Sequence, residues 1–159
     1  MFAVYVAQKR YEKSNAAKLI LQEIRYAEQK IGNFKSHGSY NLNEKVLPTN
    51  NWNNNISLFV KELGETEIDQ ISDFFSNAAR LDEVLMAVNE FRNKQVISPL
   101  GGPAANTAVI TDTAKLPQEA RNLIQTISQG IGDLYNTPAT SRLREIASHK
   151  WHKIFRTLS

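Results

Sequence analysis

The sequence predicts an all-α fold, a bundle of about five helices around a long N-terminal helix, with two long loops. The clearest signal is an apolar stripe in steps of three and four, the spacing of one helix face. It comprises Ala17, Ile20, Ile24, Ala27, Ile31 and Phe34. Weaker stripes of the same period recur further along. The stretches without it, 35–51 and 96–117, contain the Pro and Gly that interrupt helices.

The length of 159 residues is that of a single domain, and 42% hydrophobic with 22% charged residues is typical of a globular chain. There are no cysteines, which excludes disulfides, cysteine-ligated zinc and thiol nucleophiles. We divide the chain into residues 1–13, the juxtamembrane end of a truncated membrane span, and residues 14–159, one helical domain.

The N-terminal end combines an apolar run at residues 2–7 with the cations that follow it. An apolar segment, an interfacial Tyr and then Lys/Arg is typical of the cytoplasmic exit of a membrane span. The run is too short to cross a bilayer, which takes about 20 residues. The expected membrane-proximal residues are Phe2, Val4, Tyr5, Val6, Lys9, Arg10 and Lys13. The alternative is that these turns pack on the domain or on a second copy.

The first helix is expected over residues 3–32, because it contains no Pro and Gly32 is a typical helix stop. Its stripe covers about two and a half heptads, fewer than a coiled coil needs. We therefore interpret it as the spine of the core. Leu19 and Tyr26 lie on the opposite side, so we expect this helix to be buried on more than one face.

Two more helices are expected in the middle of the chain. One covers residues 53–63 and ends at Gly64, and Trp52 before it should anchor the preceding loop to the core. The next starts at Thr66, which forms an approximate capping box with Asp69, and ends near Asn93.

The last third of the chain is expected to begin as a loop. Val109 and Ile110 have strand-like side chains, but we assign them to this loop because no second strand is evident. Pro117 opens the fourth helix. Thr137 and Pro138 open the fifth, which should run to Leu158.

The charges are distributed unevenly. Net charge is +4 over residues 1–35, −4 over 36–101 and +3 over 102–159. Three interpretations remain open: pairing of the ends with the middle, a basic face for an acidic partner, or solvated helix faces. Glu65, Asp69 and Asp73, which we call the acidic ridge, share one helix face. A surface ridge lacks the cleft that acid–base catalysis requires, so the ridge is better interpreted as a partner for basic residues.

Two candidate sites occupy the C-terminal helix. Glu145, His149 and His152 project from one face at spacings that zinc would accept, but no fourth ligand is evident and a solvated face is the alternative. An anionic-partner face for nucleic acid or anionic lipid would consist of Arg142, Arg144, Lys150, Lys153 and Arg156. Its aromatic neighbours lie towards the apolar side, which favours core packing.

The segments FAVYVAQKRYEK, SNAAKLILQEIRYAEQKI and YNLNEKVLPTNNW together resemble a group of uncharacterised bacterial proteins. These have one N-terminal membrane span and a small helical cytoplasmic domain. The resemblance covers roughly the first 90 residues. It implies a cytoplasmic protein anchored at the inner membrane, and it carries over no functional residues.

The function expected from the sequence is a non-enzymatic interaction module at the cytoplasmic face of the membrane, binding a protein partner or itself. One alternative is a nucleic-acid or anionic-lipid binder that uses residues 142–156. Another is an enzyme of unknown class with a site in loops 35–52 or 96–117, near His37 or Trp52. No nucleophile or phosphate-loop motif occurs, we expect no cofactor, and the sequence identifies no small-molecule substrate.

Overall fold

The computed structural model describes residues 2–37, 40–96, 109–110, 116–130 and 133–148. In these ranges the five α-helices are α1 Phe2–His37, α2 Asn51–Asn55, α3 Glu65–Val96, α4 Gln118–Gly130 and α5 Ser141–Ser148. Short 3₁₀ turns occur at η1 Ile56–Leu58, η3 Leu134–Asn136 and η4 Pro138–Thr140. The fold is all-α, as the sequence predicts. Among these residues no helix is both long and apolar enough to cross a membrane.

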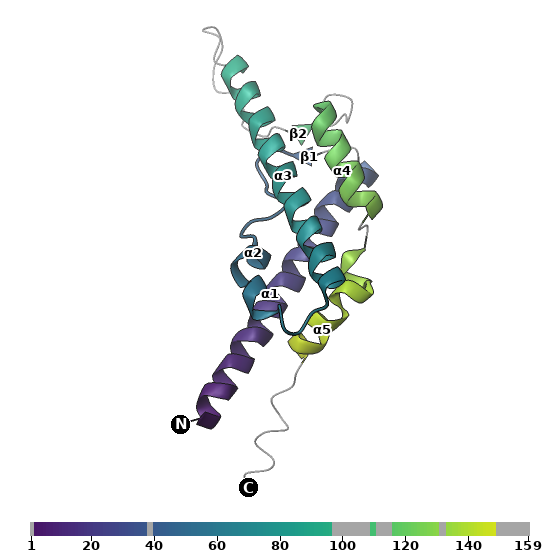
Figure 1. Ribbon diagram of the computed structural model, residues 1–159. Helices are drawn as coiled ribbons and strands as arrows, with labels where there is room; N and C mark the ends of the chain where they lie inside the picture. Colours follow the sequence, from purple (N-terminus) through teal and green to yellow (C-terminus); the bar gives the residue numbers. More distant parts are fainter. Residues whose placement is uncertain (1, 38–39, 97–108, 111–115, 131–132, 149–159) are drawn as a thin grey trace.

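The long helix α1 is the spine of the fold. At 1.5 Å per residue its 36 residues extend for about 54 Å. Its N-terminal end and the C-terminal end of α3 project from opposite ends of the molecule (Figure 1). The predicted stop at Gly32 is wrong, because α1 continues to His37. Buried Ile31 and Phe34 on either side of the glycine hold this part of the helix against the core.

One continuous core joins all five helices. The stripe from Ala17 to Phe34 is buried as predicted, and α1 packs against α5 while α3 packs against α4. Trp52 is fully buried, and its ring stacks at 6.3 Å from both Phe59 and Phe75. Its indole Nε1–H donates to the Ser72 hydroxyl at 2.9 Å. The prediction that Trp52 anchors the loop is confirmed.

The second and third helices differ from their predicted extents. α2 begins at Asn51 and gives way to η1 at Ile56, so an α-helix over residues 53–63 is wrong. Asn50 caps α2 in a left-handed conformation, φ 51°, and its side-chain oxygen accepts from the Asn53 N–H. α3 begins before Thr66, because the Glu67 carboxylate accepts from the Gly64 N–H at 2.8 Å and so caps the helix.

A two-stranded sheet replaces part of the two predicted loops. β1, Tyr40–Asn41, pairs antiparallel with β2, Val109–Ile110. The assignment of Val109 and Ile110 to a loop is therefore wrong, since the partner strand comes from the other irregular stretch. The fifth helix also starts later than predicted, because η4 precedes α5. Its expected extension to Leu158 lies outside the described residues.

Candidate partner-binding groove

The outer face of α1 lies between two walls. Its floor comprises Lys18, Leu19, Gln22, Arg25 and Tyr26, on the side of the helix away from the buried stripe. Leu19 remains 48% exposed and Tyr26 is half-buried, so the expectation that α1 is buried on more than one face is wrong here. This face of α1 is therefore left uncovered by the described residues.

The first wall is the loop before α2, which a buried carboxylate of α1 fastens. Glu23, only 5% exposed, accepts from the backbone N–H groups of Thr49, Asn50 and Asn51 at 3.1, 2.7 and 2.7 Å. It also accepts from the Thr49 hydroxyl at 3.0 Å. Negative charge is favourable there, because α2 presents unpaired N–H groups at its N-terminus. Pro48 and Thr49 thereby stand beside the floor of the groove.

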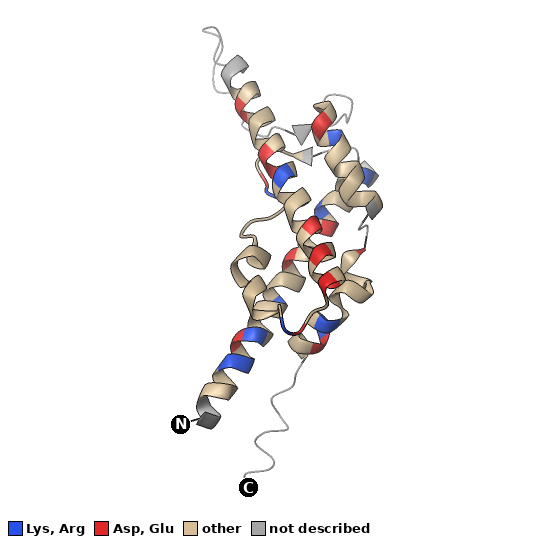
Figure 2. Cartoon of the chain, viewed as in Figure 1, with Lys and Arg blue, Asp and Glu red and all other residues tan. Residues whose placement is uncertain are grey.

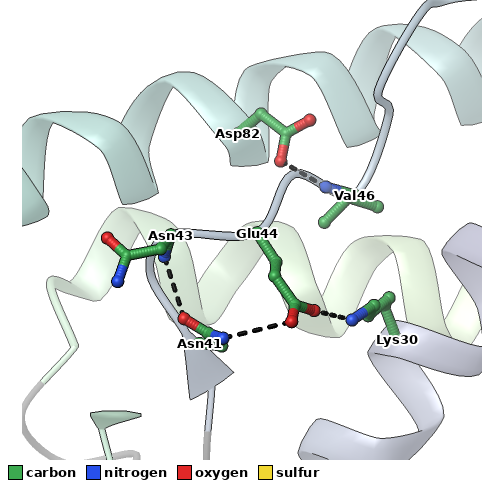
Figure 3. A network of polar contacts seen from close by, with 6 residues as sticks. All are labelled: Lys30, Asn41, Asn43, Glu44, Val46 and Asp82. Carbon is green, nitrogen blue, oxygen red and sulfur yellow. Dashed lines mark hydrogen bonds and ion pairs between the residues drawn. The ribbon is translucent and has the colours of Figure 1, made fainter. Parts of the chain in front are cut away.

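Asp82 of α3 fixes the same loop upstream (Figure 3). Its buried carboxylate accepts from the Val46 and Leu47 N–H groups at 2.6 and 2.9 Å. Burial raises the pKa of Asp82, although these two hydrogen bonds and nearby Lys45 oppose the rise. The segment is held from α1 as well, since Lys30 forms an ion pair with Glu44. The loop wall is thus fastened to both long helices.

The second wall is built around Tyr135 in η3. Its backbone N–H donates to Glu28 of α1 at 3.1 Å. Two guanidinium groups approach its ring, Arg25 at 4.9 Å and Arg144 at 5.9 Å from the ring centroid. Burial raises the pKa of Glu28, and the charge of Asp133 raises it further. Ala147 of α5 completes this wall.

Between these walls lie two hollows of about 480 and 250 Å³ that share Gln22 and Tyr26. We call the combined surface the α1 groove. Lys18 and Arg25 line the larger hollow, and its described lining residues include no carboxylate, although Glu28 of the second wall interacts electrostatically with Arg25. Glu23 is the one acid in the smaller hollow, and its oxygens are already hydrogen-bonded to the loop. Chemically this is an amphipathic, cationic surface.

The predicted membrane-proximal residues all lie in the N-terminal part of α1. Tyr5 is 59% exposed, and Lys9 and Arg10 are exposed too. Lys9 pairs with Glu12, while Lys13 reaches the body and pairs with Glu62 at 2.6 Å. Val6 is half-buried. Phe2 and Val4 are part of the helix, but their side chains are not described.

The predicted anionic-partner face is only partly described. Arg142 is exposed and pairs with Glu145 at 3.3 Å. Arg144 is turned inward, where it donates to the Thr137 carbonyl. Lys150, Lys153 and Arg156 lie outside the described residues. So do His149 and His152 of the zinc candidate, and the described residues contain no other group of metal-ligating side chains.

The structurally decisive carboxylates Glu23, Glu28 and Asp82 were not singled out from the sequence. A weak signal was present: Glu23 and Asp82 each adjoin an apolar residue of the core stripe, Ile24 and Leu81. Most acids in such positions simply point into solvent. The hydrogen-bond partners of these three carboxylates are backbone N–H groups of distant segments. Since every residue other than Pro has such a group, the sequence does not indicate which of them will be the partner.

No known protein family, curated protein or solved structure matches this chain. The geometry of the described residues is therefore the basis for a function.

Proposed function

We propose that this protein is a non-enzymatic interaction module, held at the cytoplasmic face of a membrane by the projecting end of α1 and binding a protein through its helical body. The observation that carries the proposal is that projection (Figure 1). Tyr5, Lys9 and Arg10 belong to this N-terminal part of α1, and all three are exposed.

The side chains on the projection support membrane contact. Tyr is favoured at the membrane–water interface, and each Lys or Arg near an anionic leaflet contributes about 1 kcal/mol. Figure 2 shows Lys and Arg on this end of α1. The Lys13–Glu62 ion pair joins α1 to the body just behind the projection. A rigid helix of this kind would set the distance between the body and the bilayer.

Vesicle co-sedimentation tests the membrane part of the proposal. Binding is expected to vesicles that contain phosphatidylglycerol and to be much weaker with phosphatidylcholine alone. The double variant Lys9→Glu, Arg10→Glu should bind the anionic vesicles at least about 30-fold more weakly, from roughly 1 kcal/mol for each of the two cations removed, and the two added carboxylates weaken binding further. Lys35→Glu, Lys61→Glu is the matched control, because it changes the charge equally at exposed positions outside both the projection and the α1 groove and should still bind.

Fractionation of the full-length gene product provides a second test in cells. Recovery with the membrane fraction is expected. Equal binding to both kinds of vesicle, equal weakening in the control variant, or recovery solely as a soluble monomer would each contradict the proposal. Charge reversal at Lys150, Lys153 and Arg156 distinguishes the alternative, because a binder that uses residues 142–156 would lose vesicle or nucleic-acid binding in that variant.

A further inference from the structure

Among the residues that the structure describes, no ion pair compensates the acidic ridge on α3. Glu65, Asp69 and Asp73 are all exposed. Figure 2 shows Asp and Glu along the N-terminal part of α3. Within the described residues, the ion pairs from α1 go to other acids, Lys13 to Glu62 and Lys30 to Glu44, and none includes the ridge. Pairing of the basic ends with the acidic middle, one of the three interpretations that the sequence leaves open, therefore does not include these three carboxylates in the described part of the chain.

The ridge is unfavourable for α3 in isolation. Acidic side chains four residues apart on one helix repel each other. The helix N-terminus favours Glu65, but that effect falls off within the first turn and does not reach Asp73. A cationic partner would relieve this repulsion.

The α1 groove has the complementary charge at a matching spacing. Lys18 and Arg25 are seven residues apart, about 10.5 Å along the α1 axis. Glu65 and Asp73 are eight residues apart, about 12 Å along the α3 axis. The two cations and the two carboxylates are all exposed. If α3 of another copy lay along the floor of the groove, its carboxylates could stand opposite the two cations. Leu19 and Tyr26 would then cover the apolar part of the contact.

The two surfaces of one chain cannot meet. Ile71 and Phe75 on the opposite side of α3 face the core, as do Ile20 and Ile24 on the opposite side of α1. The ridge and the groove therefore both point away from the core they share. Their contact requires two copies, and the groove of one copy would take the ridge of the next.

From this complementarity we infer that the α1 groove binds the acidic ridge of α3 from a second copy of this chain. The inference rests on the proposed function, since it names the partner of the body as the protein itself. Such a head-to-tail contact makes rings or open chains rather than a two-fold dimer. Because the attraction is between exposed charges, the association should weaken as salt rises.

Sedimentation velocity of the full chain, without vesicles, tests the inference. The wild-type protein should form concentration-dependent oligomers at low salt. Lys18→Glu, Arg25→Glu should weaken association about tenfold or more, and so should Asp69→Lys, Asp73→Lys. The variant that combines all four changes should associate again, because its groove and ridge have exchanged signs. An equimolar mixture of the two double variants should associate for the same reason.

Far-UV circular dichroism of each variant checks that the bundle is folded, and the recovery in the combined variant excludes simple misfolding. A wild-type protein that stays monomeric at low salt would overturn the inference, as would a combined variant that stays monomeric. A monomer that binds a poly-glutamate peptide through Lys18 and Arg25 would assign the groove to a foreign acidic segment instead. Vesicle binding is measured separately, so failure here leaves the membrane proposal standing.

Discussion

The carboxylate of Glu23 in α1 accepts a hydrogen bond of 2.7 Å from the backbone N–H of Asn51, the first residue of α2. The same carboxylate also binds Thr49 and Asn50. One side chain of the longest helix thus holds the start of a helix 28 positions further along. The loop wall of the α1 groove depends on this contact.

Glu23→Gln should destabilise the fold by about 2 kcal/mol, because a buried charge-assisted contact is replaced by two donors facing each other. The amide oxygen can replace Oε1, but the amide NH₂ then opposes the Asn51 N–H. Urea denaturation measures the loss. Glu83→Gln is the control, since Glu83 is exposed on α3 and should change stability by less than about 0.5 kcal/mol. Equal stability of the two variants would show that Glu23 does not fasten the loop.

Ser72→Ala should cost about 1–2 kcal/mol, because it leaves the buried indole N–H of Trp52 without its acceptor. Thermal unfolding followed by circular dichroism measures this loss of stability. Ser76→Ala on the same helix serves as the reference, because Ser76 is exposed. If the two variants unfold at the same temperature, the Trp52–Ser72 hydrogen bond contributes nothing to anchoring the loop.

Gly32→Ala should stabilise the protein by roughly 0.5–1 kcal/mol, because Ala is the better residue inside a helix. A Cβ built on Gly32 has no atom within 4 Å, so nothing opposes the change. A helix that stopped at Gly32 in a left-handed conformation would instead be destabilised by Ala. The sign of the change in urea midpoint therefore tests whether α1 continues to His37 in solution.

Glu28→Gln should alter the pH dependence of stability. The raised pKa of Glu28 means that the folded protein binds this proton more tightly than the unfolded chain does. Its favourable contribution is complete below the unfolded pKa, about 4.3, and is lost as pH rises through the folded pKa. The variant should match the wild type near pH 3 and become more stable by less than about 1 kcal/mol near neutral pH, since partial exposure screens the charge.

Urea denaturation at several pH values measures this difference. Gln retains the acceptor for the Tyr135 N–H, so the variant removes the charge while the hydrogen bond can persist. Glu145→Gln supplies an exposed comparison on α5. A difference between Glu28→Gln and wild type that shrinks as pH rises would contradict the assigned direction of the pKa shift.

The sequence by itself determined the helical class and the core spine. The spacing of apolar residues from Ala17 to Phe34 is a local property of one helix. All six residues of this stripe are therefore buried in the folded protein, as the spacing predicts. The unbroken course of α1 through this stripe is equally local, because residues 3–32 contain no Pro. The sequence also predicts that Trp52 anchors its loop to the core, because a large aromatic residue among polar neighbours is stabilised most by burial.

Tertiary structure alone decided which face of α1 stays open, and it paired Tyr40–Asn41 with Val109–Ile110 across nearly 70 positions. It also turned Glu23 and Asp82 inward to the backbone N–H groups of the loop. The physical reason is common to all three. Periodicity reports the relation of a residue to its own helix, whereas these contacts depend on backbone groups and surfaces that only packing brings together.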